Sequence, residues 1–491
     1  SKSTDVFFHK DQLAWNGLGF PTVPSINLID ERTLNDIAHL KLQALKMMDR
    51  MDPLGNAFPF SNRSYYFDEL LVRWLDIIDH MKLDVIICPD TPHRVYDYIF
   101  FIAAKYRGLT RIVLKQTAFK DGFLVQVNDT ITSFRVTTHT YLASKSTTLI
   151  HAKIAEVRGD ASDYRLEYME RQHAADKKRR RGILYSDSVK LVSVKKAIKR
   201  AIKLLMQLPS NVSPTREWSI FVEKGGIPQE AGETFFKKAV REAREASQMR
   251  AFTAYYDELV QKKPPTGVRY IGVALHYQPE RTTSPEGGFF VDQLLLVKML
   301  DKKLPRDLEI VVKEHPTHFL SGWNGKTSPL TAGRSTTFYQ KLGQISDRVR
   351  FISCDLSSFE FIDNAIAIAT VTGTIGFEAI LRDTPAIIFG DAWYKMSPGA
   401  FSVKTSEDLS KFFNEVINNN FIFPHQEVDE YFDRLERDLI WISASKNADY
   451  IFQNDKYTAK NIANWLSIIL DKEQQRWLTT SGLNRSNSLR E

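Results

Sequence analysis

The side chains best suited to chemistry follow a short apolar run at residues 309–313. Lys313 ends this run, and a glutamate, His315 and Pro316 come directly after it. The run predicts a buried strand, so the imidazole of His315 leaves the carboxyl end of a sheet, and Pro316 stiffens the turn. An imidazole there can donate a hydrogen bond to a nucleotide phosphate, and Lys313 can help to neutralise the phosphate charge. The alternative is a structural histidine that caps the loop.

A glycine-containing turn is the second candidate for phosphate binding. It separates a predicted strand at 365–371 from a helical pattern, and another apolar strand follows at 385–389. Glycines let a phosphate approach the backbone at the positive end of a helix, and a threonine hydroxyl can donate to it. Glu378, in the first helical turns, either accepts from ribose hydroxyls or complements the helix N-terminus. The turn residues with this expected role are Gly373, Thr374 and Gly376.

A long polar loop at 275–293 offers acids for catalysis. Glu280 lies just beyond a predicted strand end, where it can act as a general base or as a carboxylate nucleophile. Asp292 is a weaker catalytic candidate because it falls inside the next predicted helix, where it can simply be solvated. The same loop supplies three candidate substrate-binding residues, which are His276, Gln278 and Arg281.

Two further segments are expected to touch substrate. Trp393 belongs to a loop after the strand at 385–389, where it either walls a base or sugar or plugs a seam between domains; both alternatives are open. Asp90 and His93 follow an N-terminal strand predicted at 84–89, and they are expected on the acceptor side. No zinc-protease, P-loop or nucleophile-elbow motif occurs in the sequence. Asp90 and His93 are close enough in sequence to bind a metal, but no further ligands accompany them, so no metal site is expected.

The elements that position these residues alternate along the chain. Strands and helices alternate from residue 269 to residue 389, which predicts a parallel, doubly wound sheet. Near the N-terminus, a strand, a helix at 94–106 and a strand at 111–115 predict a βαβ unit. The expected domains are an N-terminal Rossmann-like domain on the acceptor side (1–143), a helical basic insertion (144–265), a C-terminal Rossmann-like nucleotide-sugar domain (266–425), and C-terminal helices with a tail (426–491).

Composition narrows the class of protein. The chain has 491 residues, so more than one domain is expected, and its two cysteines fall in different predicted domains. A disulfide framework is therefore not expected, and a reducing compartment is favoured. The sequence has no signal-peptide pattern and no apolar run long enough for a transmembrane helix, so a cytoplasmic location is expected. The net charge of +7 is mild for this length and does not choose among anionic partners.

A basic amphipathic helix is predicted at 190–206. Its apolar stripe is flanked by lysines and arginines. Packing on the protein with a solvated basic face is the favoured interpretation, and an interfacial helix on an anionic inner-membrane leaflet is the alternative. Nucleic acid is not an expected partner because no aromatic-basic pattern or known binding module accompanies the charge.

The motifs at 313–316, 371–382 and 389–394 resemble the capsule polysaccharide biosynthesis family, which includes bacterial β-Kdo transferases of capsule and lipopolysaccharide assembly. The resemblance covers residues 269–394. It implies a GT-B fold, in which two Rossmann-like domains face a cleft and the C-terminal one holds the nucleotide donor. It also implies that His315 and Pro316 contact the nucleotide, that the Gly373 turn lies near its phosphate, and that no metal is needed for donor binding.

One feature departs from the family pattern. Kdo transferases of this family carry a catalytic Asp-Gln pair after the strand that precedes the His-Pro strand. Here that strand is followed by His-Tyr-Gln-Pro-Glu, so Glu280 would have to substitute, and an Asp-Gln pair at 292–293 lies one loop later. The donor sugar and the stereochemical course are therefore left open.

The expected function is glycosyl transfer from a nucleotide sugar to a surface polysaccharide or glycolipid. The expected donor is CMP-Kdo or another CMP-activated acid sugar, ahead of a UDP sugar, and it is a substrate, so no cofactor is implied. The expected acceptor is lipid-linked or an oligosaccharide, met near the inner leaflet. The alternatives are a nucleotide-sugar epimerase of the same fold and a non-catalytic protein that binds or assembles polysaccharide.

Overall fold

A computed structural model describes most of the N-terminal quarter of the chain and most of residues 252–441. The described residues are 21–50, 59–119, 122–132, 143–159, 252–263, 267–278, 280–319, 334–418, 421–441, 466–467 and 471. The predicted basic helix at 190–206 lies outside them, as do most residues of the predicted C-terminal segment at 426–491. The chain forms two compact units, whose described residues fall within Ser1–Ile86, Pro92–Thr110 and Val157–His425 for the first, and within Ile87–Thr91, Arg111–Glu156 and Gln426–Glu491 for the second.

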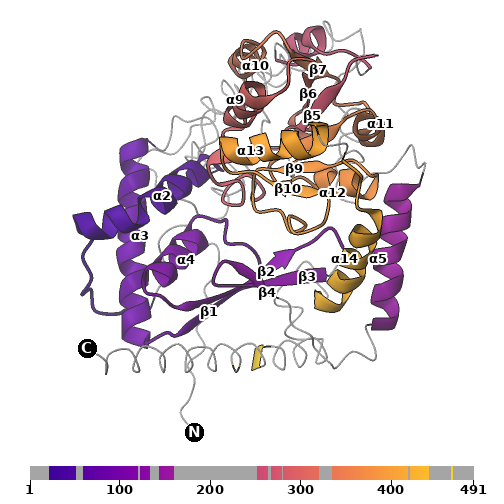
Figure 1. The fold of residues 1–491 in the computed structure, drawn as a ribbon. Helices are drawn as coiled ribbons and strands as arrows, with labels where there is room; N and C mark the ends of the chain where they lie inside the picture. The colour runs from indigo at the N-terminus through magenta and orange to yellow at the C-terminus, as the bar shows by residue number, and fades with distance from the viewer. Residues whose placement is uncertain are drawn as a thin grey trace, which may run out of the picture. The chain divides into compact units, whose positions relative to one another are not determined.

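A six-stranded parallel sheet organises the C-terminal part of the first unit (Figure 1). Its strands are β5 (Tyr270–Ala274), β6 (Glu309–Lys313), β7 (Val349–Ile352), β8 (Ala367–Thr370), β9 (Ala386–Ile388) and β10 (Ala400–Ser402). All neighbours are parallel, in the order β10-β9-β8-β5-β6-β7. Counted from β5 as strand 1, this is the 3-2-1-4-5-6 order of dinucleotide-binding sheets. The predicted parallel, doubly wound sheet is confirmed here; β10 was not predicted.

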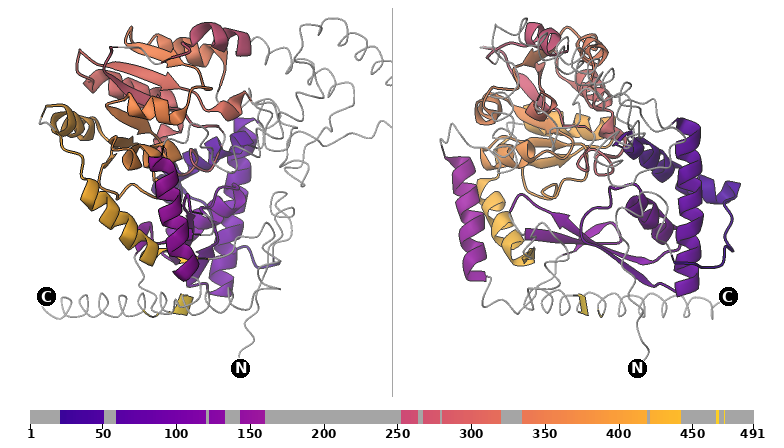
Figure 2. Two further views of the ribbon diagram at one scale, coloured as in Figure 1. Left: turned by 90° about the vertical axis from the view of Figure 1, so that its right-hand side faces the viewer. Right: turned by 180° about the vertical axis from the view of Figure 1, so that it is seen from behind.

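Helices cover both faces of this sheet (Figures 1 and 2). Alternate strand residues such as Ile310 and Val312 join a core formed with α9 (Gln293–Lys303), α10 (Thr336–Gly343) and α13 (Ser406–Phe413). The other face packs against α11 (Ser358–Asp363) and α12 (Thr374–Leu381). The packing there is close, because a Cβ atom added at Gly272 would lie 2.6 Å from Ile368 and 2.8 Å from Phe361. Strands buried on both faces explain the continuous apolar runs in the sequence.

Short polar side chains set the starts of these helices. Ser335 and Ser357 accept hydrogen bonds from backbone N–H groups at the starts of α10 and α11, and Thr405 forms a reciprocal capping box with Asp408 at α13. Asp292 caps α9 in the same way by accepting from the N–H of Leu294. The prediction that Asp292 falls inside a helix was therefore wrong. The preceding residues form a separate 3₁₀ turn, η2 (Gly288–Val291).

Three N-terminal helices belong to the same unit as this sheet. They are α2 (Glu31–Met47), which continues into the turn η1 (Met48–Arg50), α3 (Phe60–Met81) and α4 (Tyr96–Tyr106). The helices pack on one another, and the indole N–H of Trp74 in α3 donates to the carbonyl of Tyr96 at 3.1 Å. Helix α4 matches the helix predicted at 94–106, whereas α3 was not predicted.

The second unit carries most of a mainly antiparallel sheet. Its strands are β1 (Val85–Cys88), β2 (Thr110–Gln116), β3 (Gly122–Val127), β4 (Thr130–Thr132) and β11 (Ile440–Trp441). The predicted strand-helix-strand unit corresponds to β1, α4 and β2, and β1 and β2 are neighbours in the sheet. Strand β3 pairs antiparallel with β2, β4 and β11, and none of β3, β4 and β11 was predicted. The N-terminal Rossmann-like domain stays a prediction. Strands β3 and β4 form a tight hairpin, in which Asn128 and Asp129 both have positive φ angles, of 48° and 71°, as a two-residue turn between twisted strands requires.

The described helices outside the sheet cores complete the fold. They are α5 (Ala143–Arg158), the π-helical segment η5 (Asn414–Asn418) and α14 (His425–Asp438). None of the described helices is long and apolar enough to cross a membrane. The division of the chain at residues 143, 265 and 425 stays a prediction.

Candidate functional site

The strand order of the parallel sheet reverses between β5 and β8, and this reversal locates the candidate site. In open α/β sheets, the loops that follow two such strands diverge and leave room for a ligand at the carboxyl edge. His276 follows β5, and residues 371–373 follow β8. The neighbouring strand β6 ends in the His-Pro turn. The sheet therefore brings three of the predicted segments to one edge.

His276 links the loop after β5 to the loop after β8 by hydrogen bonds. Its Nε2 accepts from the backbone N–H groups of Val371 and Thr372, each at 3.2 Å, and lies 2.9 Å from the Thr370 hydroxyl. Burial, with a smaller contribution from the charge of Arg334, lowers the pKa of His276 to about 4. The ring is therefore neutral at pH 7, with the proton assigned to Nδ1 because Nε2 accepts. A direct substrate contact by His276 stays a prediction; the structure gives it a role in holding the turn after β8.

The turn after β8 needs its glycines for packing. Gly373 is the N-cap of α12, and a Cβ atom there would lie 2.7 Å from the Thr370 hydroxyl. At Gly376, a Cβ atom would lie 2.3 Å from the Tyr394 hydroxyl. The half-buried residue Thr374 opens the helix, so the positive end of α12 is at the sheet edge. The arrangement is suited to an anion, and the nucleotide-binding role of these residues stays a prediction.

The His-Pro turn presents one ring nitrogen as a donor. His315 is half-buried at the start of the 3₁₀ turn η3 (Pro316–His318), and its Nδ1 accepts from the N–H of Thr317 at 3.2 Å. Burial lowers the pKa of His315 to about 3, and the charges of His318 and His276 add to the shift. The ring is therefore neutral, and its proton is assigned to Nε2. A neutral Nε2–H group can donate to a phosphate or sugar oxygen.

An aromatic side chain beside this turn was missed by the sequence analysis. The ring of Tyr277 is half-buried, and its centroid lies 4.8 Å from that of His318 and 6.3 Å from that of His315. Its position directly after the β5 segment was the available signal. A half-buried ring next to a donor histidine can pack on a base or a sugar.

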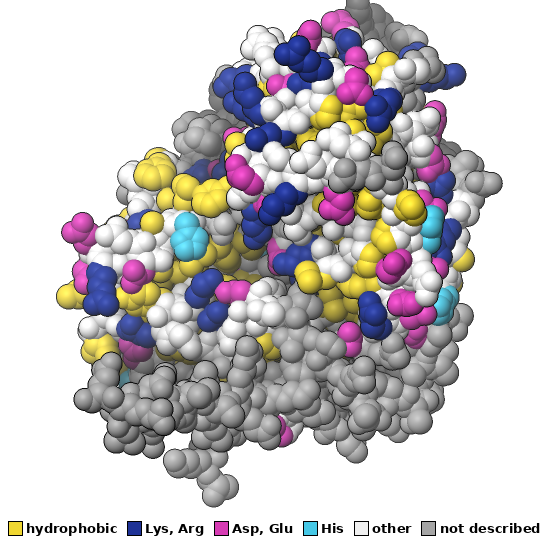
Figure 3. Space-filling model, in the orientation of Figure 1, with side chains coloured by type: hydrophobic (Ala, Val, Ile, Leu, Met, Phe, Trp, Pro, Cys, Tyr) yellow, Lys and Arg dark blue, Asp and Glu magenta, His cyan; other side chains and the backbone are white. Residues whose placement is uncertain are grey.

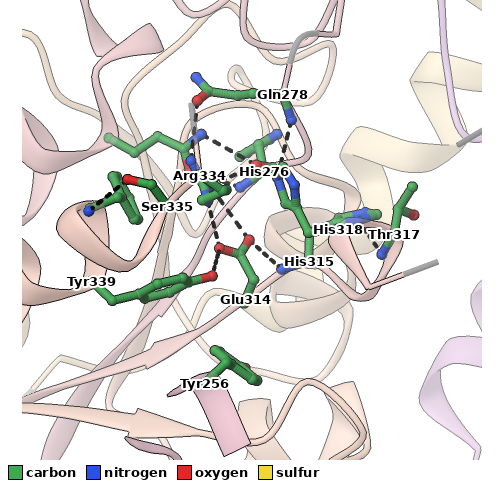
Figure 4. Close-up of polar contacts among 12 residues, drawn as sticks. Tyr256, His276, Gln278, Glu314, His315, Thr317, His318, Arg334, Ser335 and Tyr339 are labelled. Atoms are coloured by element: carbon green, nitrogen blue, oxygen red, sulfur yellow. Dashed lines mark hydrogen bonds and ion pairs between the residues drawn. The ribbon is translucent and has the colours of Figure 1, made fainter. Parts of the chain in front are cut away.

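A buried polar network underlies both loops (Figure 4). The guanidinium of Arg334, which is 2% exposed, bonds Glu314 at 2.6 Å and also reaches Gln278 and the carbonyl of His276. Burial alone would raise the pKa of Glu314, but the charges of Arg334 and His318 and its hydrogen bonds hold that pKa below its usual value. Arg334 was missed because it lies 20 residues beyond Glu314 in no motif.

The predicted phosphate-binding lysine is internal. Lys313 is 6% exposed, its Nζ donates to the carbonyl of Cys354 at 3.1 Å, and burial lowers its pKa. Its charge interacts with that of Glu378, which is itself buried in α12. Both residues therefore have partners inside the protein, and their contact with a nucleotide stays a prediction.

The two candidate catalytic acids have different surroundings. Glu280 is half-buried at the sheet edge, and its Oε2 accepts from the Thr282 hydroxyl at 3.0 Å. Asp292 instead uses its carboxylate to cap α9. Arg281 forms a long ion pair with Glu286, with 3.9 Å between Nε and Oε1. The catalytic roles of Glu280 and Asp292 stay predictions.

The aromatic residues after β9 support the turn from within. Trp393 is 8% exposed and packs against Phe377 of α12, with 5.0 Å between the ring centroids. The Tyr394 hydroxyl donates to the carbonyl of Gly373. The two predicted alternatives for Trp393, a wall for a base or sugar and a plug at a seam between domains, stay predictions.

The predicted acceptor-side residues belong to different units. Asp90, in the second unit, accepts from the N–H of Thr91 at 2.8 Å, and His93 is a half-buried residue of the first unit. Their role stays a prediction. Within the described residues, no group of three or more His, Cys, Asp or Glu side chains is arranged to hold a metal ion. On the face drawn in Figure 3, Lys and Arg side chains are interspersed with Asp and Glu rather than gathered in one basic patch.

Comparison with solved structures gives remote similarities. A β-Kdo 2,7 transferase, KpsC of Thermosulfurimonas dismutans, is 15% identical, with 42% of this chain and 66% of that chain covered, at a TM-score of 0.21. The β-Kdo 2,4 transferase of the same protein is 17% identical over 33% of this chain and 50% of that chain, at a TM-score of 0.21. A UDP-GlcNAc 2-epimerase of Methanocaldococcus jannaschii, in complex with UDP-GlcNAc and UDP, is 13% identical over 76% of this chain and 80% of that chain, at a TM-score of 0.23.

A search of curated proteins found no match. A family model described as capsule polysaccharide biosynthesis protein matches residues 280–401. This segment contains the His-Pro turn, the turn at Gly373, Arg334 and Glu280. Residues 280–401 therefore carry the capsule polysaccharide biosynthesis family segment, and the resemblance predicted from the sequence is confirmed over that range.

Proposed function

We propose that this protein is a GT-B glycosyltransferase that uses a nucleotide sugar to build a surface polysaccharide or glycolipid. The observation that carries the proposal is the meeting of the His-Pro turn and the Gly373 turn at the switch point of a 3-2-1-4-5-6 sheet. The family match over 280–401 supports the same class of reaction.

Donor binding in this proposal uses groups that need no charge of their own. The neutral Nε2–H of His315 donates to the nucleotide, and the positive end of α12 faces its phosphate. Negative charge grows on the leaving phosphate during transfer, so donors held in advance stabilise the transition state more than the ground state. The donor expected from the resemblance is CMP-Kdo or another CMP-activated acid sugar, ahead of a UDP sugar.

Glu280 supplies the reacting carboxylate in this proposal. At the sheet edge it either removes the proton of the acceptor hydroxyl or attacks the sugar as a nucleophile. Arg281 or Lys313 helps to neutralise the charge of the phosphate, and the acceptor enters beside Asp90 and His93. A lipid-linked acceptor would bring the protein to the inner leaflet as a peripheral protein.

Product analysis tests the reaction. The full-length protein is incubated with CMP-Kdo or UDP-GlcNAc, with and without an oligosaccharide acceptor, and the products are identified by mass spectrometry and NMR. Acceptor-dependent release of nucleotide with a lengthened acceptor is the expected result. An altered sugar nucleotide formed without acceptor would contradict transfer and indicate an epimerase. Nucleotide binding with no product from any donor would indicate a non-catalytic binding protein.

A further inference from the structure

Arg334 contacts two loops, the loop after β5 and the loop after β6 that contains the His-Pro turn. Its Nε donates to Glu314 at 2.6 Å, its Nη1 to Gln278 at 3.1 Å, and its Nη2 to the carbonyl of His276 at 2.9 Å and to Gln293 at 3.2 Å. Figure 4 shows Arg334 between the loop after β5 and the loop after β6. One planar guanidinium thus joins the ends of two neighbouring strands to the start of α9 and α10.

These contacts reach both ends of the His-Pro turn. At its start, the Glu314 carboxylate accepts from the backbone N–H of His315 at 2.7 Å, as well as from the Tyr339 hydroxyl at 2.6 Å. At its end, the N–H of Gln278 donates to Nε2 of His318 at 3.3 Å. If the guanidinium of Arg334 were oriented differently, the hydrogen bonds that hold His315 and His318 would therefore both change.

Stability alone does not require an ion pair here. The surroundings include a cluster of aromatic rings in the sheet core, among them Phe252, Tyr256 and Tyr339. A buried ion pair loses hydration, and well-packed apolar residues in its place are often as stable. The guanidinium does provide something apolar groups cannot, which is a rigid fork of donors in fixed directions. Lysine, whose ammonium is a compact charge with three rotatable donors, cannot reproduce it.

We propose that Arg334 is a positioning residue for nucleotide binding, which acts through Glu314 and Gln278 to hold His315 in the direction that meets the ligand. This inference rests on the proposed function for the ligand, which is a nucleotide or its sugar ester. It adds a residue that contacts no substrate but sets the geometry of one that does.

The test replaces the charged pair without leaving a lone charge. In Arg334→Met/Glu314→Gln, the new amide oxygen can still accept from the His315 N–H, and the amide NH2 can donate to the oxygen of the Tyr339 hydroxyl, so the variant is expected to fold. Arg348→Met is the matched control. Arg348 also bonds a carboxylate, Asp301, at 2.7 Å, and backbone carbonyls, but it precedes β7, at the opposite end of the strands from the His-Pro turn.

Two readouts separate positioning from a structural role. The first is the ¹³Cε1 NMR signal of His315 in the full-length protein, assigned by its loss in His315→Gln. We expect this signal to move in the double variant but not in Arg348→Met. The second is the Kd for CMP and for UDP, which is expected to rise by about 10- to 100-fold for whichever nucleotide the parent binds.

The His315→Ala background completes the test. If Arg334 acts through His315, the fold-change caused by the double variant should nearly disappear in that background. An unmoved His315 signal, or an equal fold-change with and without His315, would overturn the inference while leaving the proposed function in place. Failure of the parent to bind any nucleotide would overturn the proposed function, and the His315 signal would still decide whether Arg334 positions the turn.

Discussion

At the scale of single residues, the site separates groups that bind from groups that react. His315 offers a neutral donor, whereas Glu280 offers a half-buried carboxylate that accepts from a threonine hydroxyl. The two lie in different loops at one sheet edge. Their functions should therefore be separable by substitution.

Replacing Glu280 with glutamine tests the reacting carboxylate. The amide keeps the size and the hydrogen bond to Thr282 but is neither a base nor a nucleophile. We expect kcat to fall by at least about 100-fold, the lower end of the range for general acid–base catalysis, while nucleotide Kd changes by less than about threefold. Turnover and calorimetric titration measure the two quantities.

Asp292→Ala is the matched carboxylate control. Its loss removes the N-cap of α9, which should lower the free energy of unfolding by about 0.5–2 kcal/mol while activity of the folded protein persists. A larger loss of kcat in Asp292→Ala than in Glu280→Gln would contradict the assignment of the reacting carboxylate to Glu280.

At the scale of elements, the turn between β8 and α12 is shaped by close packing. Gly376→Ala places a methyl group against the Tyr394 hydroxyl, so we expect a loss of about 1–3 kcal/mol in the free energy of unfolding, measured by chemical denaturation. Adding Tyr394→Phe, which removes that hydroxyl, should recover part of the loss.

Gly343→Ala provides the control for that experiment. A Cβ atom at Gly343 in α10 would meet Phe351 at an ordinary 3.6 Å, so alanine should be neutral or stabilise the protein by up to about 1 kcal/mol. Equal effects of alanine at the two glycines would contradict the packing argument.

The elements also show how far the sequence could be interpreted. The strand predicted at 309–313 matches β6, because Ile310, Val311 and Val312 form a continuous apolar run between polar neighbours. The hairpin at Asn128 and Asp129 was missed because an Asn-Asp pair is a weaker turn signal than Asn-Gly. Helix α3 was missed because its N-cap residue, Pro59, has no side chain that can cap a helix, so the sequence shows no start signal there.

The site was predicted less completely than the sheet. The His-Pro and glycine turns follow strands directly, so strand prediction brought them to one edge. Arg334 could not be found in this way, because its partners come from residues 276, 278, 293 and 314, which only the folded sheet brings together. Burial of Lys313 and Trp393 likewise depends on helix packing that the sequence does not display.

At the scale of the whole molecule, buried neutral histidines make stability depend on pH. His276 has a pKa lowered to about 4, against about 6.5 in an unfolded chain. Between these values the unfolded state binds more protons, so stability falls as pH decreases from about 6.5 towards 4. The slope from His276 is at most about 1.4 kcal/mol per pH unit.

Thermal unfolding of the parent and of His276→Gln between pH 7.5 and 4.5 checks this dependence. The variant should start less stable, because it loses the contacts to Val371 and Thr372, but its melting temperature should fall less steeply with acid. Parallel curves for the two proteins would mean that His276 does not contribute to the acid sensitivity.

The central claim is that a nucleotide binds at the His-Pro edge of the parallel sheet. The most direct measurement is calorimetric titration of the full-length protein with CMP, UDP, GDP and ADP, repeated with His315→Ala. His425→Ala, which changes an exposed histidine paired with Asp383, is the control. We expect the parent to bind one of these nucleotides selectively, CMP in preference to UDP, and we expect its Kd to rise at least about 10-fold in His315→Ala but not in His425→Ala. Binding that is unaffected by His315→Ala, or no binding of any nucleotide, would contradict it.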